Sequence, residues 1–248
     1  MASRLRWKQA QSYERAHWEE VSDHIEKSER QGLTWYKWRA ENLLRNIGKA
    51  FPDDTPSFTE ASVLEVGSGP VGCISQLQAR ERIALDPLCD FFSTKPSLIE
   101  QRSPDVVYKN AQGEELPFED GHFDMVVIEN VIDHVENAGG VMDQIYRVLK
   151  PDGVLYLTVN LHPAWGYFLH EVVSKLRIDK GHPHTFTIPK IRNFLEHHGF
   201  QIYYDEWEDY KKCKAEEWKS NSTRSKLKAV SGLSEFLFTS VSRKTDKA

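Results

Sequence analysis

The sequence has few cysteines, no long apolar run and no excess of positive charge. Its three cysteines, Cys73, Cys89 and Cys213, are widely separated and lack metal-ligand spacing. This argues against a disulfide framework and a zinc site, so we expect no metal and a reducing, cytoplasmic location. No apolar stretch approaches 20 residues, and residues 1–8 are charged. We therefore expect neither export nor a membrane partner.

Net charge and length further limit the class of protein and its partners. The formal net charge is -5, so the chain has no overall positive field to hold a phosphate backbone, and nucleic acid is not expected as a partner. A chain of 248 residues with 40% hydrophobic residues suits one α/β domain with a cap. We expect a small-molecule substrate. The oligomeric state stays open, with a homodimer as one alternative.

The apolar pattern changes along the chain. Residues 8–50 alternate aromatic and charged positions at helical intervals, which predicts two helices. Short runs that are apolar on both faces follow, and such runs suit buried parallel strands. They lie at 63–66, 83–85, 106–108, 125–128 and 154–159. A helical pattern at 141–149 separates the last two runs, which makes a βαβ repeat and predicts a doubly wound α/β sheet.

The remaining sequence predicts a helix at 188–198, a strand at 200–204 and a last strand at 235–241. We expect residues 1–58 to form a helical cap or lid and residues 59–248 to form the main domain. A charged insertion at about 206–232 is rich in Lys, Arg and Ser, so it is expected to be solvated.

A glycine-rich loop follows the first predicted strand. Gly67, Gly69 and Gly72 satisfy the G-x-G-x-x-G pattern, which lets backbone approach a ligand at the carboxyl edge of the sheet. A tight turn without a ligand is the plainer alternative. Asp86 ends the second run, 21 positions after Glu65, where a carboxylate can accept both ribose hydroxyls. The alternative for Asp86 is a turn or helix start. Together these features favour an adenosine-bearing ligand.

Three ordered segments carry a more specific resemblance. Residues 63–70 (Val-Leu-Glu-Val-Gly-Ser-Gly-Pro), 112–127 and 149–155 resemble the first motif, the adenine-binding turn with the fourth strand, and the lead into the fifth strand of class I S-adenosylmethionine-dependent methyltransferases. The first segment is the Gly-Ser-Gly-Pro variant found in small-molecule methyltransferases. The resemblance implies an enzyme with S-adenosyl-L-methionine as cofactor. It also implies a Rossmann-like, seven-stranded, mostly parallel sheet with an antiparallel last strand and an N-terminal helical cap.

The resemblance also implies which residues surround the cofactor. They are Glu65, Gly67, Ser68 and Gly69 at its amino-acid part, Asp86 and Pro87 at the ribose, Gln112, Gly113 and Glu114 at the adenine, and Asn130 beside the methionine portion. Two departures from the family pattern stand out. Gln112 replaces a residue that is often Asp, and the third glycine is displaced to Gly72 by the insertion of Pro70 and Val71.

Methyl transfer is an in-line displacement, so an enzyme mainly aligns the acceptor and excludes water. A general base is needed only where the acceptor carries a proton that must leave. His134, in the loop after the fourth predicted strand, is the candidate, with packing or a helix start as the alternative. Asp133 is predicted either to contact substrate or to cap the next helix.

Substrate contacts are predicted from four further side chains. They are Tyr13 and Trp38 in the N-terminal helices, His162 in the loop after the fifth strand, and His184 in a predicted lid. Aromatic residues at helical spacing are more often core than pocket. Tyr and Trp nevertheless suit a half-buried lid, since each has an apolar body and a polar tip.

The acceptor is expected to be a small molecule such as a sugar, polyketide or phenolic metabolite, methylated on oxygen first and on nitrogen second. No Asn-Pro-Pro-Tyr-like motif occurs, which disfavours amino groups of bases and glutamine side chains. Two alternatives remain open. One is a catalytically inactive, methyltransferase-like binding subunit. The other is an NAD(P)-dependent oxidoreductase, which the glycine pattern favours but Glu65 and the Pro117-Phe118 turn do not.

Overall fold

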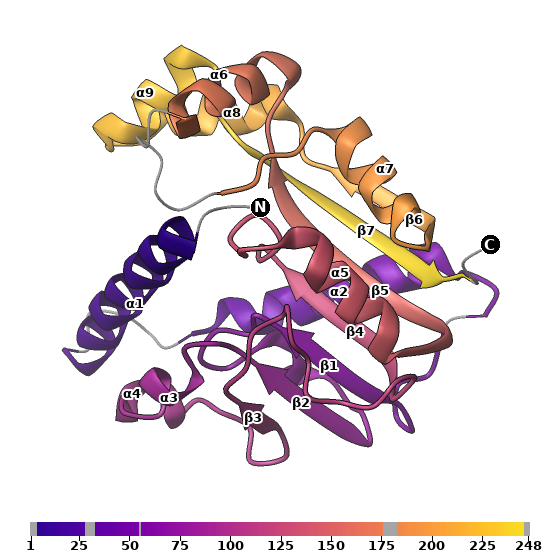
Figure 1. The fold of residues 1–248 in the computed structure, drawn as a ribbon. Coiled ribbons are helices and arrows are strands. Elements are labelled where there is room, and N and C mark those ends of the chain that lie inside the picture. Colours follow the sequence, from indigo (N-terminus) through magenta and orange to yellow (C-terminus); the bar gives the residue numbers. More distant parts are fainter. Residues whose placement is uncertain (1–3, 28–32, 55, 176–182, 246–248) are drawn as a thin grey trace.

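The computed structural model describes residues 4–27, 33–54, 56–175 and 183–245, and its centre is a seven-stranded sheet in the order β3-β2-β1-β4-β5-β7-β6 (Figure 1). The strands are β1 (Ser62–Val66), β2 (Glu81–Leu85), β3 (Val107–Lys109), β4 (Phe123–Glu129), β5 (Leu149–Leu161), β6 (Phe200–Trp207) and β7 (Phe236–Lys244). β7 is antiparallel to both β5 and β6, while the other pairs are parallel. The predicted mostly parallel sheet with an antiparallel last strand is confirmed.

Both faces of the sheet are buried, as the doubly apolar runs predict. All five residues of β1 are buried, and alternate side chains enter different cores. Leu64 and Val126 belong to the core on one face, whereas Val63, Met125 and Val127 belong to the core on the other. Because successive side chains of a strand point to opposite faces, a central strand covered on both sides must be apolar throughout.

Helices cover the two faces. Helix α2 (Trp35–Ala50) and the short 3₁₀ helix η1 (Cys73–Gln76) contribute to one core, and α5 (Ala138–Val148) and α7 (Ile188–His197) to the other. The remaining helices are α1 (Arg4–Glu26), α3 (Cys89–Phe92), α4 (Pro96–Ile99), α6 (Ala164–Lys175), α8 (Tyr210–Lys219) and α9 (Thr223–Ser231). No helix in these described stretches combines the length and apolar character needed to cross a bilayer.

The predicted charged insertion is helical. It contains α8 and α9, which begin at Asp209 and Ser222, whose side chains accept backbone N–H groups of the first turn. Most side chains of α8 are exposed, so the segment is solvated although it is regular. The proposed division at residue 58 stays a prediction. Helix α2 contacts η1, β6 and β7, so the segment before residue 58 packs directly on the sheet.

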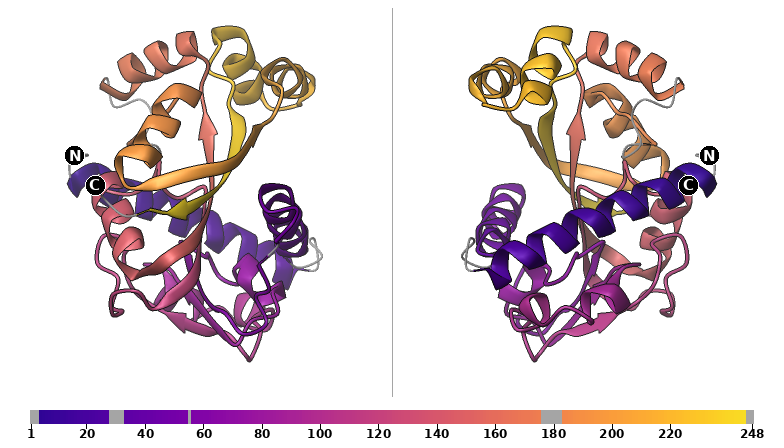
Figure 2. Two further views of the ribbon diagram at one scale, coloured as in Figure 1. Left: turned by 90° about the vertical axis from the view of Figure 1, so that its right-hand side faces the viewer. Right: turned by 90° about the vertical axis from the view of Figure 1, so that its left-hand side faces the viewer.

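The carboxyl ends of β1, β2 and β4 meet at one edge of the sheet. Val66, the last residue of β1, is in register with Leu85 of β2 and Ile128 of β4. Residues just beyond these positions are therefore brought together although they are far apart in sequence. Helix α1 lies on the same side of the molecule as this edge and is separated from the sheet (Figures 1 and 2).

Candidate cofactor-binding and active site

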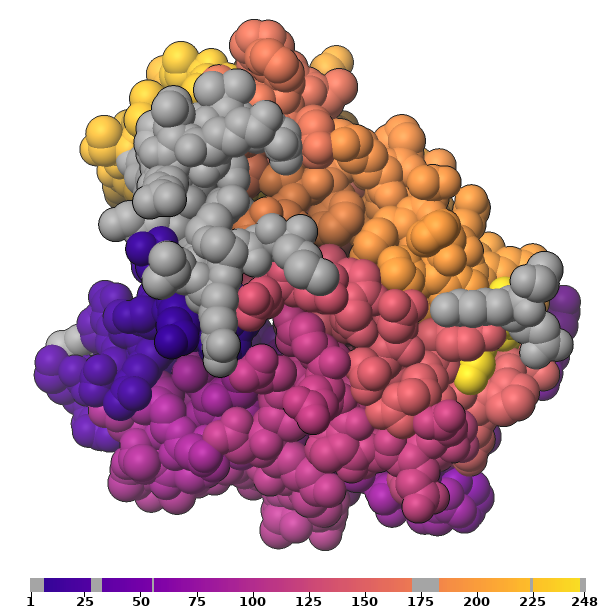
Figure 3. All heavy atoms as spheres, viewed as in Figure 1, coloured from indigo at the N-terminus to yellow at the C-terminus, as the bar shows by residue number. Residues whose placement is uncertain are grey.

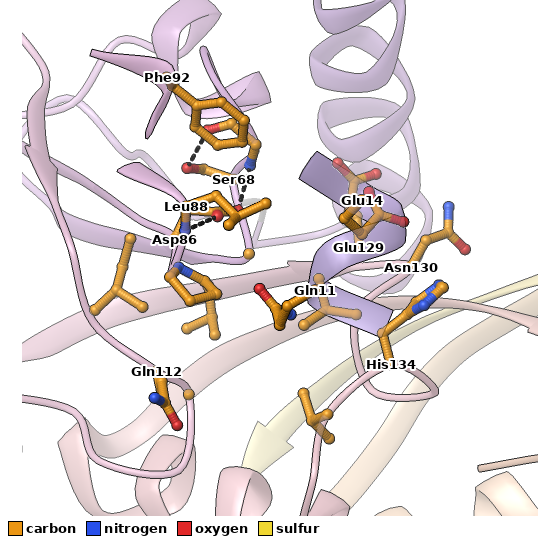
Figure 4. Close-up of a pocket in the computed structure, with 18 of the residues that line it drawn as sticks. Gln11, Glu14, Ser68, Asp86, Leu88, Phe92, Gln112, Glu129, Asn130 and His134 are labelled. Carbon is orange, nitrogen blue, oxygen red and sulfur yellow. Dashed lines mark hydrogen bonds between the residues drawn. The ribbon is translucent and has the colours of Figure 1, made fainter. Parts of the chain in front are cut away.

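A cavity of about 190 Å³ opens at this edge of the sheet, under α1. Figure 4 shows side chains from α1 and from the ends of β2 and β4 directed toward it. The predicted residues that line it are Gly67, Ser68, Gly69, Asp86, Pro87, Gln112, Gly113, Glu114, Asn130 and His134. The space-filling view shows the N-terminal segment, in indigo, beside the purple and magenta part of the chain that contains β1 to β4 (Figure 3). The structure thus brings most of the predicted cofactor residues to one cavity.

The glycine loop forms a floor without side chains. Gly67 and Gly69 have φ angles of 70° and 63°, in the left-handed region that favours glycine. A Cβ atom on Gly67 would lie 2.2 Å from a methyl group of Val131, and one on Gly69 would lie 2.7 Å from the hydroxyl of Tyr36. The loop therefore presents bare backbone to the cavity, which fits a ligand that must approach the chain closely.

Replacing Gly67 by alanine is expected to destabilise the fold by about 2–4 kcal/mol, through the positive φ angle and the collision with Val131. Urea unfolding measures this loss. The double variant Gly67→Ala/Val131→Ala removes the collision but keeps the backbone cost, so it should recover part of the stability. Equal stabilities of the single variant and the wild type would contradict the close approach.

Glu65 lies behind the glycine loop and does not line the cavity. Its carboxylate is buried and accepts the backbone N–H groups of Cys73 at 3.2 Å and Ile74 at 2.9 Å. A Cβ atom on Gly72 would lie 2.6 Å from the same carboxylate, which explains why the displaced third glycine is needed there. The structure therefore places Glu65 as a support of the loop, where the resemblance implied direct contact with the cofactor.

Arg39 of α2 links the tips of β1 and β4. Its guanidinium donates to Glu129 at 2.7 Å and lies 3.7 Å from Glu65. Burial raises the pKa of Glu65 to about 7, and the nearby positive charge of Arg39 acts in the opposite direction. Polar atoms of Glu65, Cys73 and Glu129 all lie within 4.8 Å of one another, as metal ligands would. Because Arg39 already supplies a cation there, this cluster gives no support for a metal.

Asp86 is buried at the end of β2 and fixes two turns. One carboxylate oxygen accepts the N–H of Gly69 at 2.9 Å, and the other accepts the N–H of Leu88 at 2.8 Å. Burial is the main cause that raises the pKa of Asp86 to about 6. Each oxygen keeps a second lone pair, so the same carboxylate can also accept hydroxyl groups from the cavity.

The predicted adenine side is built from two loops. Glu114 accepts the backbone N–H groups of Glu136 at 2.9 Å and Asn137 at 3.1 Å, so its side chain ties the loop before α5 to the cavity wall. Gly113 is buried, and a Cβ atom there would meet Val66 and Val141. Gln112 is exposed at the rim. Its amide is therefore accessible from the cavity.

Asn130 and His134 form the wall opposite Asp86 (Figure 4). Asn130 has a φ angle of 54°, a left-handed conformation that asparagine tolerates better than most residues. His134 is partly exposed, and its Nε2 lies 3.6 Å from the buried carboxylate of Asp133. Asp133 itself does not line the cavity. The pair resembles a base held in place by a carboxylate behind it.

The predicted substrate residues lie away from this cavity. Tyr13 is exposed, and Trp38 lines a second cavity on the other side of Arg39. His162 is buried against the ring of His170 at 4.9 Å, and the ring of His184 donates to the carbonyl of Val135 at 3.0 Å. These four side chains therefore do not meet at one surface.

Helices α1 and α2 supply wall residues that the sequence argument did not assign to the site. From α1 they are Trp7, Gln11, Glu14 and Trp18, and from α2 they are Tyr36 and Arg39. The α1 residues are spaced by three or four positions, which places them on one face of the helix. That helical spacing is the signal in the sequence that could have identified these wall residues. The Tyr36 hydroxyl donates to the carbonyl of Ser68 at 3.2 Å, so α2 also holds the glycine loop.

The strand order separates this fold from the dinucleotide-binding one. Dinucleotide-binding domains have the order 3-2-1-4-5-6, whereas here an antiparallel β7 is inserted between β5 and β6. The strand order, the glycine loop and the acidic residue at the end of β2 match the pattern of class I S-adenosylmethionine-dependent methyltransferases. Residues 64–157 match the family model described as Methyltransferase domain, which covers β1 to most of β5.

Curated proteins that are similar in sequence to this chain are named as methyltransferases. The chain is 43% identical over 70 residues to the ubiquinone/menaquinone biosynthesis C-methyltransferase UbiE of Psychromonas ingrahamii, a match that covers 28% of this chain and 26% of that protein. The chain spans about a quarter to a half of the length of the curated relatives it matches first, from 26% to 49%.

Solved structures share the fold. A Bacillus halodurans protein assigned as a methyltransferase superposes with a TM-score of 0.59 at 20% identity, covering 82% of this chain and all of that one. Phosphoethanolamine N-methyltransferase 2 of Haemonchus contortus, solved in complex with S-adenosyl-L-methionine, gives a TM-score of 0.57 at 18% identity and covers 82% of this chain and 53% of that one. At these identities the likeness concerns the fold.

Proposed function

We propose that this chain transfers a methyl group from S-adenosyl-L-methionine to an oxygen or nitrogen atom of a small-molecule acceptor. One observation carries the proposal. The bare glycine loop, the carboxylate of Asp86 and the side chain of Asn130 come from three strand ends and line the same cavity. When bound, the cofactor supplies a methyl group on a positively charged sulfur.

The residues present fit this cofactor. Gly67 and Gly69 leave room for the amino-acid portion, and Asp86 has free lone pairs for the two ribose hydroxyls. Gln112 and Glu114 border the proposed adenine pocket. Among the described residues that line the cavity, Arg39 is the only lysine or arginine, and it is paired with Glu129. A cofactor carrying net positive charge and no phosphate suits such a wall.

His134 acts in this proposal as the base that accepts a proton from the acceptor. Its ring faces the cavity, and the carboxylate of Asp133 lies 3.6 Å from its Nε2. Trp7 and Trp18 of α1 cover the cavity opposite the sheet, so they exclude water from the reacting atoms. Replacing His134 by glutamine should then lower kcat and change its pH profile, without a comparable change in cofactor affinity.

Cofactor affinity is expected to depend on pH through Asp86. The pKa of this group is raised to about 6, so the carboxyl is ionised at pH 8 and protonated at pH 5. Only the ionised form offers acceptors at both oxygens to ribose hydroxyls. Below pH 6, affinity for S-adenosylhomocysteine should fall toward about tenfold per pH unit. Calorimetric titration between pH 5 and 8 measures this, and a flat profile would contradict the assignment.

The test of the proposed function combines two readouts. Stabilisation by S-adenosylhomocysteine, but not by NADH, in a thermal-shift assay supports the methyltransferase over an NAD(P)-dependent oxidoreductase. Transfer of labelled methyl to a metabolite extract separates an enzyme from an inactive binding subunit. Product analysis then gives the acceptor atom. A label on carbon would move this chain toward the chemistry named for UbiE and away from oxygen or nitrogen.

A further inference from the structure

A second cavity of about 290 Å³ lies between α2 and the β5-β7-β6 part of the sheet. It shares Glu129 with the first cavity, and the Arg39–Glu129 ion pair lies at this shared wall. Residues of α2 and of the three strands line it. They are Trp38, Asn42, Arg45, Asn46, Glu129, Tyr156, Thr158, Glu206, Trp207, Glu208, Leu237 and Thr239.

Two buried polar atoms in this wall have no hydrogen-bond partner among the described residues. They are Oδ1 of Asn46 and Oγ1 of Thr158, on side chains that are 2% and 3% exposed. The Asn46 side chain lies near the carboxylate of Glu206 and the hydroxyl of Tyr156. Because a carboxylate only accepts, the amide nitrogen faces Glu206, which leaves Oδ1 for another donor. A buried polar atom without a partner is costly, so this wall suits a ligand that carries hydroxyl groups.

The charges around the second cavity are balanced. Glu129 is paired with Arg39, and Glu206 accepts from Lys49 at 2.8 Å. Arg45 and Glu208 remain as one positive and one negative group in the lining. A charged ligand would meet one attractive and one repulsive group here, so the wall favours an uncharged ligand.

Trp38 supplies the apolar part of the wall. Its ring is 57% exposed, which is unusual for so large a side chain, and Tyr156 is buried in the same wall. The side chain of Trp207 points to the opposite face of β6, where Arg192 of α7 contacts both Trp207 and Asp205. A flat indole face beside hydrogen-bonding groups matches a ring with C–H faces and hydroxyl edges.

We propose that the second cavity binds a glycosyl unit, an uncharged polyhydroxylated ring that hydrogen-bonds Thr158 and Asn46 and contacts Trp38. The two cavities share Glu129, so a ring bound here lies beside the cofactor cavity. If methyl transfer is the function, as proposed above, the glycosyl unit belongs to the acceptor. The binding of the ring itself does not depend on that assignment.

The test is a direct titration of the full chain, without cofactor, by methyl glucoside, galactoside and mannoside. Saturation-transfer NMR should show saturable binding of at least one glycoside. The variant Thr158→Val keeps the side-chain shape and should weaken that binding about fivefold or more, because one hydrogen bond is lost. Trp38→Ala should weaken it further, because the indole contact is lost. Trp218→Ala removes a tryptophan that is 56% exposed on α8, outside the cavity, and should leave binding unchanged.

Three results would overturn the proposal. They are no saturable signal from any glycoside, equal affinity of Thr158→Val and wild type, and preferential binding of tetramethylammonium. Circular dichroism of each variant checks that the fold is intact. S-adenosylhomocysteine is titrated in parallel. If S-adenosylhomocysteine does not bind, methyl transfer is refuted but the glycosyl site is not. If only the glycosides fail to bind, the glycosyl site is refuted but methyl transfer is not.

Discussion

Replacing Arg39 by methionine is expected to lower the free energy of unfolding by about 3–5 kcal/mol, because a buried ion pair loses one partner. Glu129 is 5% exposed and Glu65 is fully buried, so water cannot replace the guanidinium. The Glu65 carboxylate then binds a proton in the folded state, since burial already raises its pKa to about 7. The folded variant binds more protons than the unfolded chain, so its stability should rise as pH falls from 8 to 5.

Urea unfolding at pH 5 and pH 8 measures both effects. Arg45→Met is the matched control, since Arg45 is exposed on the same helix and its loss should change stability by about 0.5 kcal/mol or less. The double variant Arg39→Met/Glu129→Gln should recover part of the loss. Equal effects of Arg39→Met and Arg45→Met would show that the pair at the shared wall contributes little.

Replacing Asp86 by asparagine is expected to weaken binding of S-adenosylhomocysteine about a hundredfold, equivalent to about 3 kcal/mol from two charge-assisted hydrogen bonds. The amide can still accept one backbone N–H, from Gly69 or Leu88, but its nitrogen faces the other. Some rearrangement of the loop therefore adds to the loss. Calorimetry at pH 8, where the wild-type carboxyl is ionised, measures the difference.

The matched control for Asp86 is Asp90→Asn. Asp90 is exposed on α3, four positions later, and accepts from the side chain of Asn110. The same change of charge there should leave cofactor affinity within about threefold, because an exposed charge is screened by solvent. A variant Asp86→Asn that binds as tightly as wild type would remove the ribose contact from the proposed function.

The sequence predicts the sheet well because its signals are local. The central strand β4 carries four successive apolar residues at 125–128, and that run is visible without any neighbour. The glycine loop and Asp86 are equally local, since each directly follows a strand. Strand ends meet at one edge in any parallel sheet, so these residues could be placed together before the structure.

Long-range contacts explain what the sequence argument could not place. Arg39 and Glu129 are 90 residues apart, and no local pattern pairs them. Glu65 was expected at the cofactor, but its position behind the loop depends on where the N–H groups of Cys73 and Ile74 point. Trp38 was assigned to the same pocket as Tyr13, yet the two residues lie on different helices, and no local pattern in the sequence predicts how these helices are placed relative to each other.

Helix α2 forms part of both cavities. Tyr36 and Arg39 line the first cavity, whereas Asn42 and Asn46, on the same helix, line the second cavity. Any displacement of α2 therefore changes the walls of both cavities. If occupancy of one cavity shifts this helix, affinity at the other must change by a factor that is identical in either direction. Helix α2 thus provides a mechanical route for heterotropic linkage between the two cavities.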